Sequence, residues 1–289
     1  MKKKIFVRAP ALSATGYGEQ SRFALRALRS REDLFDVYIQ PIPWGQSGWV
    51  WQDNEFRQWM DERIKETQTL LAAKQLAPDI SLQITIPNEF QKLAPINVGY
   101  TAGIETDRVA PTWLQKGNEM DKILVVSNHA KTTYERTHVT LDDGGKYRLQ
   151  TPIEVVHENT PLAAQAEEIP GFDPRHDTNF LVVSQMGPRK NFKQTIKWFV
   201  EHFYEKEVGL ILKTHNKGSS VIDLQHTEGV LSGILRDYPN RKCSVSLLHG
   251  DLTEGQMRAL YEHDKVSCLI NIAHGEGFGL PLFEAARSA

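Results

Sequence analysis

Short apolar runs rich in β-branched residues recur along the whole chain and constrain its fold more than any other feature. Their near-continuous apolar character suits the strands of a parallel sheet, because helices cover both faces of such a sheet. Amphipathic helical segments lie between some of these runs, at residues 20–31, 191–204 and 255–263. This alternation predicts a doubly wound α/β fold. The runs occupy residues 5–7, 37–39, 80–84, 96–100, 123–126, 153–156, 180–183, 208–212, 245–248 and 266–270.

One segment breaks this rhythm and indicates a domain boundary. Residues 161–177 are rich in Pro, Ala, Glu and Gly and carry no buried-strand pattern, which is typical of a linker. A chain of 289 residues is long enough for two ordinary domains. We therefore expect two Rossmann-like domains, at residues 1–165 and 166–289.

Composition and charge exclude several classes of protein. Hydrophobic residues make up 40% of the chain and charged residues 24%, as in a globular protein. The formal net charge of −2 provides no overall basic field, so no nucleic-acid binding is expected. The two cysteines, Cys243 and Cys268, build neither a disulfide framework nor a zinc cluster. No apolar run approaches the roughly 20 residues of a transmembrane span. We expect a cytoplasmic protein, with peripheral contact to a membrane left open.

Tryptophans crowd the segment at residues 44–59. Trp44, Trp49, Trp51 and Trp59 all fall within it. One interpretation is a packed excursion over the sheet. The other is an acceptor-binding surface, because indole faces stack on sugars and on bases. The sequence leaves both interpretations open.

The clearest chemical motif lies near the C-terminus. The run at 266–270 leads into Asn-Ile-Ala-His-Gly-Glu-Gly-Phe-Gly-Leu-Pro-Leu-Phe-Glu at 271–284, which predicts a strand, a glycine-rich turn and a helix. Glycines allow the backbone to approach a ligand closely, and a helix N-terminus favours phosphate. Glu276 precedes the helix and Glu284 lies on it, so their carboxylates can accept hydrogen bonds from hydroxyls at the two ends of one ligand.

This motif resembles the E-x7-E motif of retaining glycosyltransferases with the GT-B fold, the group 1 or family 4-like enzymes. The resemblance implies that Glu276 contacts the transferred sugar and that Glu284 contacts the ribose. An ordinary strand-to-helix turn is the alternative. The backbone that the resemblance assigns to donor binding lies at Gly277, Phe278, Gly279 and Leu280.

The resemblance extends to Val-Val-Ser-Gln-Met-Gly-Pro-Arg-Lys-Asn at 182–191, which is similar to the first strand and loop of the family's donor domain. An Arg and a Lys bind the donor diphosphate there. Lys190 matches the family's Lys, but Gln185 stands where the Arg is expected, and Arg189 is our candidate replacement. Two cations beside a helix N-terminus suit a diphosphate leaving group. A basic helix start on the surface is the alternative.

Three further matches are weaker. His249 and Gly250 end a strand where the family lines the nucleotide-base pocket. Gly16 opens a helix after the first strand, where relatives place a loop beside the donor phosphates; its surroundings lack G-x-G-x-x-G, so a nicotinamide site is unsupported. Glu105 follows a strand and is our candidate for a catalytic polar group on the acceptor side, with a local cap or ion pair as the alternative.

The resemblance implies an enzyme that moves a sugar, a hexose by expectation, from a nucleotide sugar to an acceptor hydroxyl with retention of anomeric configuration. The leaving diphosphate assists the incoming hydroxyl, and the protein supplies positioning and charge neutralisation. No cofactor and no metal are expected, and the sequence has no Asp-x-Asp triplet. The acceptor, a glycan, a lipid or a small molecule, is not identified. By the same resemblance, residues 1–165 are the acceptor-side domain and residues 166–289 the donor domain.

Two other functions stay open at this point. One is a glycoside hydrolase that uses Glu276 and Glu284 as its carboxylate pair, against which the phosphate-favouring glycine-rich turn argues. The other is a non-catalytic nucleotide-binding or sugar-binding module, a degenerate transferase, which Gln185 favours. Relatives continue beyond the helix in which this chain ends. We therefore expect a C-terminally truncated second domain, and the activity of the fragment itself stays open.

Overall fold

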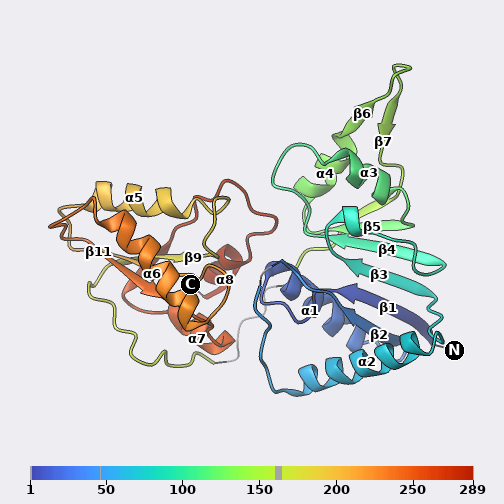
Figure 1. The fold of residues 1–289 in the computed structure, drawn as a ribbon, viewed down its shortest axis with the longest axis horizontal. Coiled ribbons are helices and arrows are strands. Elements are labelled where there is room, and N and C mark those ends of the chain that lie inside the picture. The colour runs from blue at the N-terminus through green and yellow to red at the C-terminus, as the bar shows by residue number, and fades with distance from the viewer. Residues whose placement is uncertain (1, 46, 160–164, 289) are drawn as a thin grey trace. The chain divides into compact units, whose positions relative to one another are not determined.

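The computed structural model describes residues 2–45, 47–159 and 165–288. The chain divides into two compact units, Met1–Asn159 and Thr160–Ala289. Residues 160–164, which include the start of the predicted linker, lie outside the described residues, so the predicted boundary between residues 165 and 166 stays a prediction. Each unit holds its own parallel sheet (Figure 1).

The first unit is built on a six-stranded sheet in which every neighbouring pair of strands is parallel. The strand β1 has β2 on one side and β3 on the other, so the strand order reverses between β1 and β3. In such sheets, ligands bind beyond the carboxyl ends of the strands at this switch point. The order is β2 (Phe35–Pro41), β1 (Lys3–Ala9), β3 (Ile80–Ile84), β4 (Ile96–Thr101), β5 (Lys122–Val125) and β8 (Ile153–Val155).

Helices connect these strands, and most of them start at a capping side chain. Thr15, Asn54 and Ser127 each accept a hydrogen bond from a backbone N–H in the first turn of α1, α2 and α4. A short antiparallel hairpin of β6 (His138–Thr140) and β7 (Lys146–Arg148) projects from the unit (Figure 1). The helices are α1 (Gly16–Arg29), α2 (Glu55–Ala72), the 3-10 helix η1 (Pro87–Glu89), α3 (Pro111–Gly117) and α4 (Asn128–Arg136).

The second unit holds a four-stranded parallel sheet. Its first strand, β9, pairs with β10 on one side and with the last strand, β12, on the other, so the switch point lies between β9 and β12. The side chains of Leu181 and Leu210 are fully buried in this sheet, and Ile196 packs on it from a helix. The order is β11 (Ser244–Leu248), β10 (Gly209–Lys213), β9 (Asn179–Val183) and β12 (Val266–Leu269), and the helices are α5 (Phe192–Phe203), α6 (Val221–Leu235), α7 (Glu254–Tyr261) and α8 (Leu280–Ser288).

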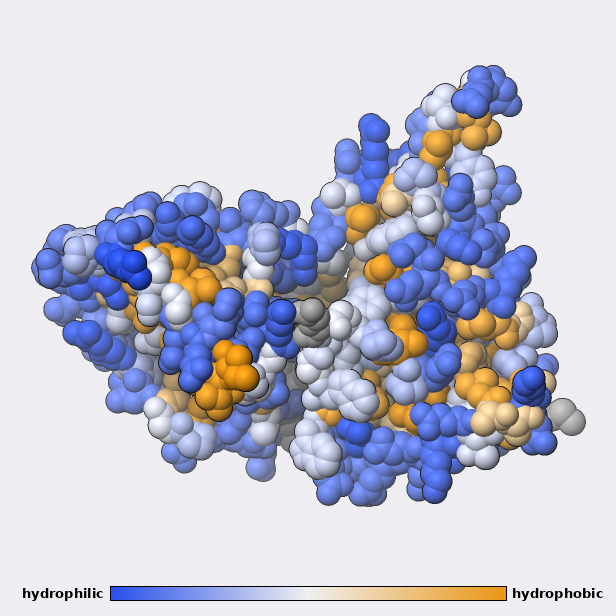
Figure 2. All heavy atoms as spheres, in the orientation of Figure 1, coloured by the Kyte–Doolittle hydropathy of each residue, from blue (hydrophilic) through white to orange (hydrophobic). Residues whose placement is uncertain are grey.

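The predicted doubly wound α/β fold is confirmed. All ten apolar runs contain strands of the two parallel sheets, and the three predicted helical segments coincide with α1, α5 and α7. Among the described residues, no helix is both long and apolar enough to cross a membrane. Hydrophilic side chains cover most of the face seen in Figure 2, with hydrophobic ones in separate patches.

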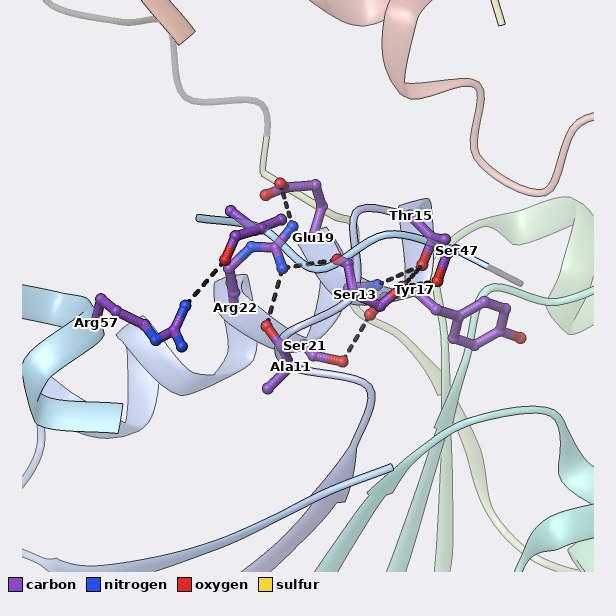
Figure 3. Close-up of polar contacts among 11 residues, drawn as sticks. Ala11, Ser13, Thr15, Tyr17, Glu19, Ser21, Arg22, Ser47 and Arg57 are labelled. Atoms are coloured by element: carbon purple, nitrogen blue, oxygen red, sulfur yellow. Dashed lines mark hydrogen bonds and ion pairs between the residues drawn. The ribbon is translucent and has the colours of Figure 1, made fainter. Parts of the chain in front are cut away.

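The loop between β1 and α1 is fixed by a buried arginine. The side chain of Arg22 is 2% exposed, and its guanidinium donates hydrogen bonds of 2.9 Å to the backbone oxygens of Ala11 and Ser13. Glu19 pairs with the same guanidinium (Figure 3). Gly18 passes so close to the loop that a Cβ atom there would lie 1.9 Å from the Ser13 oxygen. The start of α1 therefore has a position that only glycine permits.

We expect Gly18→Ala to destabilise the first unit by about 1–3 kcal/mol, because the added methyl group forces the Ser13 carbonyl away from Arg22. Gly16→Ala is the matched control, since a Cβ atom at Gly16 meets nothing within 4 Å. Urea unfolding followed by circular dichroism measures both variants. Equal stability of the two variants would show that the close approach at Gly18 is unimportant.

Candidate functional site

Two loops of the second unit meet at the switch point of its sheet. One loop follows β9 and covers residues 184–191, and the other follows β12 and covers residues 270–279. The backbone N–H of His274 donates to the backbone oxygen of Arg189 over 2.9 Å, and Asn191 Nδ2 donates to the oxygen of Ile272 over 3.1 Å. Because β9 and β12 are neighbours, segments more than 80 residues apart in sequence form one structure here.

An ion pair joins these two loops. Lys190 Nζ lies 2.6 Å from both carboxylate oxygens of Glu276, and Asn271 Nδ2 donates to Glu276 Oε1 over 2.9 Å. The guanidinium of Arg189 lies 3.7 Å from the same carboxylate and donates to the backbone oxygen of Gly275 over 2.6 Å. The predicted donor-binding cations and the predicted sugar-contacting carboxylate therefore form one cluster.

The charges of this cluster are unequal. Burial alone raises the pKa of Glu276, but hydrogen bonds from Lys190 and Asn271, together with the charges of Lys190 and Arg189, hold it below its ordinary value. Glu276 is therefore ionised at neutral pH and neutralises one of the two cations. The side chain of Arg189 is 52% exposed, compared with 16% for Lys190. Lys190 is therefore the more buried of the two cations beside Glu276.

The glycine-rich turn leads directly from Glu276 into α8. Gly279 has a φ of +83°, a left-handed conformation that favours glycine, and Leu280 is the first residue of the helix. This geometry directs backbone N–H groups beyond the helix start. Phe278 stacks on Phe283 with ring centroids 4.7 Å apart. Gly277, between Glu276 and Phe278, completes the segment that the sequence predicts to hold the donor.

The second predicted carboxylate has a partner of its own. Tyr261 Oη donates to Glu284 Oε2 over 2.9 Å, which links α8 to α7. The burial of Tyr261 raises the pKa of its hydroxyl far above the ordinary value, so this group stays a hydrogen-bond donor. Tyr261 therefore orients Glu284, a contact that nothing in the motif around Glu284 indicates.

The ends of β10 and β11 carry a second polar cluster. His249 Nε2 lies 2.9 Å from Asp223 Oδ2, and the carboxylate of Asp223 also accepts the backbone N–H groups of residues 216 and 217. Burial opposes ionisation of Asp223, but these hydrogen bonds lower its pKa to about 2. Lys213 Nζ donates to the backbone oxygen of Gly250, whose φ is +96°. His249 is thus held by Asp223, and its role toward a nucleotide base stays a prediction.

Gln185, which stands where the resemblance places an Arg, makes a different contact in the structure. The side chain of Gln185 is exposed, and its Nε2 donates to the backbone oxygen of Asn216 over 2.7 Å. It therefore links the loop after β9 to the loop after β10 and supplies no charge. Arg189 provides the second cation of the cluster around Glu276, and its role as a replacement for the missing Arg stays a prediction.

The first unit holds Gly16 and Glu105, the two predicted site residues outside the donor cluster. Gly16 is the first residue of α1. Glu105 lies exposed in the loop after β4. Tyr17 links these segments, because its hydroxyl lies 2.8 Å from Thr101 Oγ1 and accepts the backbone N–H of Ala102 over 3.2 Å. The start of α1 and the carboxyl end of β4 therefore meet at one edge of the first sheet.

Glu158, which the sequence analysis does not single out, joins this edge. It follows β8 after a gap of two residues and is partly buried. Burial, and then the negative charge of Glu19, raise the pKa of Glu158 to about 8. Burial, with smaller contributions from the charges of Glu158 and Glu105, raises the pKa of Tyr17 to about 12. The position of Glu158 just after the end of a strand is the one signal in the sequence that could have indicated it.

Comparison with known proteins separates sequence from fold. The sequence matches no protein-family profile and no curated protein. The fold is similar to HepE of Anabaena in complex with UDP and glucose, with a TM-score of 0.57 and 14% identity over 98% of this chain and 78% of that chain. It is similar to an E. coli structure described as trehalose-6-phosphate bound with UDP-2-fluoro glucose, with a TM-score of 0.56 and 11% identity over 99% and 81%. It is also similar to the apo form of WaaB, a lipopolysaccharide outer core galactosyltransferase, with a TM-score of 0.55 and 13% identity over 99% and 78%. The chain thus has the fold of the GT-B glycosyltransferases.

We expect Glu158 to make the protein less stable as pH rises. Between about pH 4.5 and pH 8 the folded state retains a proton that the unfolded state has released, so the free energy of unfolding falls through this window. Glu158→Gln removes the titrating group and should stabilise the protein at about pH 8.5 by about 1–3 kcal/mol relative to wild type, with little effect near pH 5.

Urea unfolding across this pH range measures the effect. Glu154→Gln is the matched control, because Glu154 is exposed on β8 and its pKa is lowered by a hydrogen bond from Lys122. That control should retain the wild-type pH dependence. A Glu158→Gln variant with the wild-type pH dependence would contradict the assignment.

Proposed function

We propose that this chain is a glycosyltransferase that moves a sugar from a nucleotide sugar, of which a UDP-hexose is the first to test, to an acceptor hydroxyl. The observation that carries the proposal is the cluster of Lys190, Arg189 and Glu276 at the switch point between β9 and β12. Switch points in parallel sheets are where nucleotides bind. The GT-B fold supports the same function, as do the UDP and the UDP-2-fluoro glucose bound to two of the similar structures.

In the proposed reaction, the bond between the sugar C1 and the diphosphate breaks as a bond between C1 and the acceptor oxygen forms on the same face. The acceptor proton passes to the leaving diphosphate. Because the new bond forms on the face that the diphosphate leaves, the configuration at C1 is retained. Lys190 and Arg189 neutralise the charge that develops on the diphosphate, as do the N–H groups at the start of α8. No step needs a metal ion, and metal independence is part of the proposal.

The remaining roles follow from position. Glu276 contacts the transferred sugar, and Glu284, oriented by Tyr261, contacts the ribose. The ends of β10 and β11, with His249 and Gly250, receive the base. The backbone at Gly277, Phe278, Gly279 and Leu280 provides further proposed contacts to the donor. In the first unit, Gly16 stays a candidate for donor binding and Glu105 a candidate for the acceptor side.

The ion pair gives Glu276 a second effect on the donor. A diphosphate that reaches Lys190 competes with the Glu276 carboxylate for the same ammonium group, because the two groups lie 2.6 Å apart. The carboxylate therefore weakens the binding of free nucleoside diphosphate and turns toward the sugar as the donor binds. An electrostatic exchange of this kind favours release of the product diphosphate.

A non-catalytic nucleotide-binding or sugar-binding module is the alternative that the uncharged Gln185 raises in the sequence, and the similar structures do not favour it. Mass spectrometry of products from a panel of nucleotide sugars, offered with water and with hydroxyl acceptors, separates the two functions. Transfer or donor hydrolysis supports the enzyme. Binding of nucleoside diphosphate without any product supports the module.

We expect Lys190→Ala to weaken UDP binding by about 1.5–3 kcal/mol, because it removes a charged hydrogen bond to the diphosphate. Lys206→Ala is the matched control: this exposed lysine precedes β10 and so lies at the opposite edge of the same parallel sheet. Calorimetric titration with UDP measures both variants. Equal UDP affinity of the two would refute the donor site at Lys190, provided that thermal unfolding shows both to be folded.

The same titration should distinguish the roles of Glu276 and Glu284. Glu284→Gln should weaken UDP binding by about 1.5–3 kcal/mol, because UDP carries the ribose. Glu276→Gln should leave UDP binding unchanged or strengthen it up to about tenfold, because it removes the charge that competes for Lys190, while transfer falls by about 10²-fold. Weaker UDP binding in Glu276→Gln, with transfer from saturating donor intact, would reverse the assigned roles.

A further inference from the structure

The loop between β2 and α2 presents two tryptophans to solvent. The side chain of Trp49 is 72% exposed and that of Trp51 is 88% exposed. The other two tryptophans of the segment differ. Trp59 is 8% exposed and donates to Glu32 Oε1 over 2.7 Å, and Trp44 packs against Tyr17 in a tilted arrangement with ring centroids 4.4 Å apart. The packed interpretation therefore holds for Trp59 and Trp44, and it leaves Trp49 and Trp51 unexplained.

This loop is firmly attached to the loop after β1. The backbone N–H of Ala14 donates to the oxygen of Gly48 over 2.9 Å, and the N–H of Val50 donates to the oxygen of Leu12 over 2.8 Å. These bonds enclose an antiparallel bridge between Ser13 and Trp49. Trp49 is thus exposed on a paired backbone segment.

Side chains add to this attachment. Ser47 Oγ lies 2.8 Å from Ser13 Oγ, and Arg57 Nη1 donates to the backbone oxygen of Val50 over 2.9 Å. Arg22 holds the carbonyl of Ser13 from the other side (Figure 3). The two indoles are therefore attached to a backbone that is already ordered. A ligand that binds them loses little of its binding free energy to ordering the loop.

The charges beside the indoles indicate the class of ligand. Residues 42–56 contain two ionisable side chains, those of Asp53 and Glu55, and both are exposed. Arg57 next to them is paired with Asp61 over 2.9 Å. The nearby guanidinium groups of Arg26 and Arg29 lie over the rings of Phe56 and Trp59. The two exposed carboxylates disfavour phosphate groups and the anionic surface of a membrane, both of which bind to basic residues. Carboxylates instead accept hydrogen bonds from hydroxyls, and indole faces pack on the C–H faces of sugar rings.

We propose that Trp49 and Trp51 form a stacking surface for an uncharged oligosaccharide, and that this oligosaccharide is the acceptor. Trp49 forms a β-bridge with Ser13, and residues 47–53, all described, contain no turn or bend, so we infer an extended chain. In an extended chain, side chains two positions apart leave on the same side, about 7 Å apart. Two indoles in that arrangement contact successive sugar rings. The inference rests on the proposed function, because the oligosaccharide is an acceptor only if the chain is a glycosyltransferase. It narrows the class of acceptor to glycans.

The test is a titration of the whole chain, labelled with ¹⁵N in its tryptophan indoles, with maltohexaose, cellohexaose and chitohexaose. We expect at least one of these sugars to shift the indole N–H signals of Trp49 and Trp51. The double variant Trp49→Ala, Trp51→Ala should bind that sugar with an affinity lower by about tenfold or more, because two ring contacts are lost. Trp198→Ala is the matched control, since this tryptophan is 52% exposed on α5 in the second unit.

Three outcomes overturn the inference. None of the sugars shifts the two signals, or binding survives in the double variant, or the signals respond only to vesicles of phosphatidylcholine and phosphatidylglycerol. A UDP titration on the same proteins keeps the proposed function separate. Loss of sugar binding with wild-type UDP affinity in the double variant supports the stacking surface. If the wild-type protein binds UDP and none of the sugars, only the proposal of a stacking surface is contradicted. If it binds a sugar and no UDP, only the proposed function is contradicted.

Discussion

The parallel arrangement of both sheets is the constraint on which the rest of the structure depends. Strands covered on both faces must be apolar along their length, so polar side chains collect in the loops that follow the strands. Parallel strands bring all those loops to one edge of the sheet. Lys190 and Glu276 follow two strands that are adjacent in the second sheet, and Tyr17 and Glu158 collect at the corresponding edge of the first.

The ion pair at the switch point of the second sheet illustrates how a partly buried charge is held in place. Lys190 and Glu276 are 16% and 22% exposed, so each has lost part of its hydration. Asn271 and Arg189 provide additional hydrogen-bond and charge partners, which offset that loss. The ion pair is therefore held by several partners contributed by both loops.

The first unit uses a buried cation for a different purpose. Arg22 has almost no contact with water, and an unpaired guanidinium in that position would strongly destabilise the fold. Its hydrogen bonds to two backbone oxygens, and its ion pair with Glu19, satisfy the charge and fix the loop after β1. The loop that carries Trp49 is paired with this fixed loop, so the buried arginine also determines where the exposed indoles lie.

Some helices and the hairpin escaped the sequence analysis for physical reasons. The strands β6 and β7 are three residues long and mostly polar, and they are held by backbone pairing. The helix α6 has an almost uniform hydrophobicity around its circumference, so it shows little helical periodicity. The helix α2 buries only a narrow stripe that includes Trp59 and Thr67. Periodicity detects an element only when its buried face is broad and distinct.

By itself the sequence determined the fold class, the ten strands of the two parallel sheets and the glycine-rich turn that leads into the last helix, because these depend on local composition and periodicity. Tertiary structure alone decided the strand order, and with it the pairing of Lys190 with Glu276 across 86 residues. It also decided that Tyr261 orients Glu284 and that Asp223 holds His249. The pKa of Glu158 follows from burial next to Glu19 and has no local signal. Contacts between distant segments depend on which strands become neighbours, and no local pattern of residues specifies that.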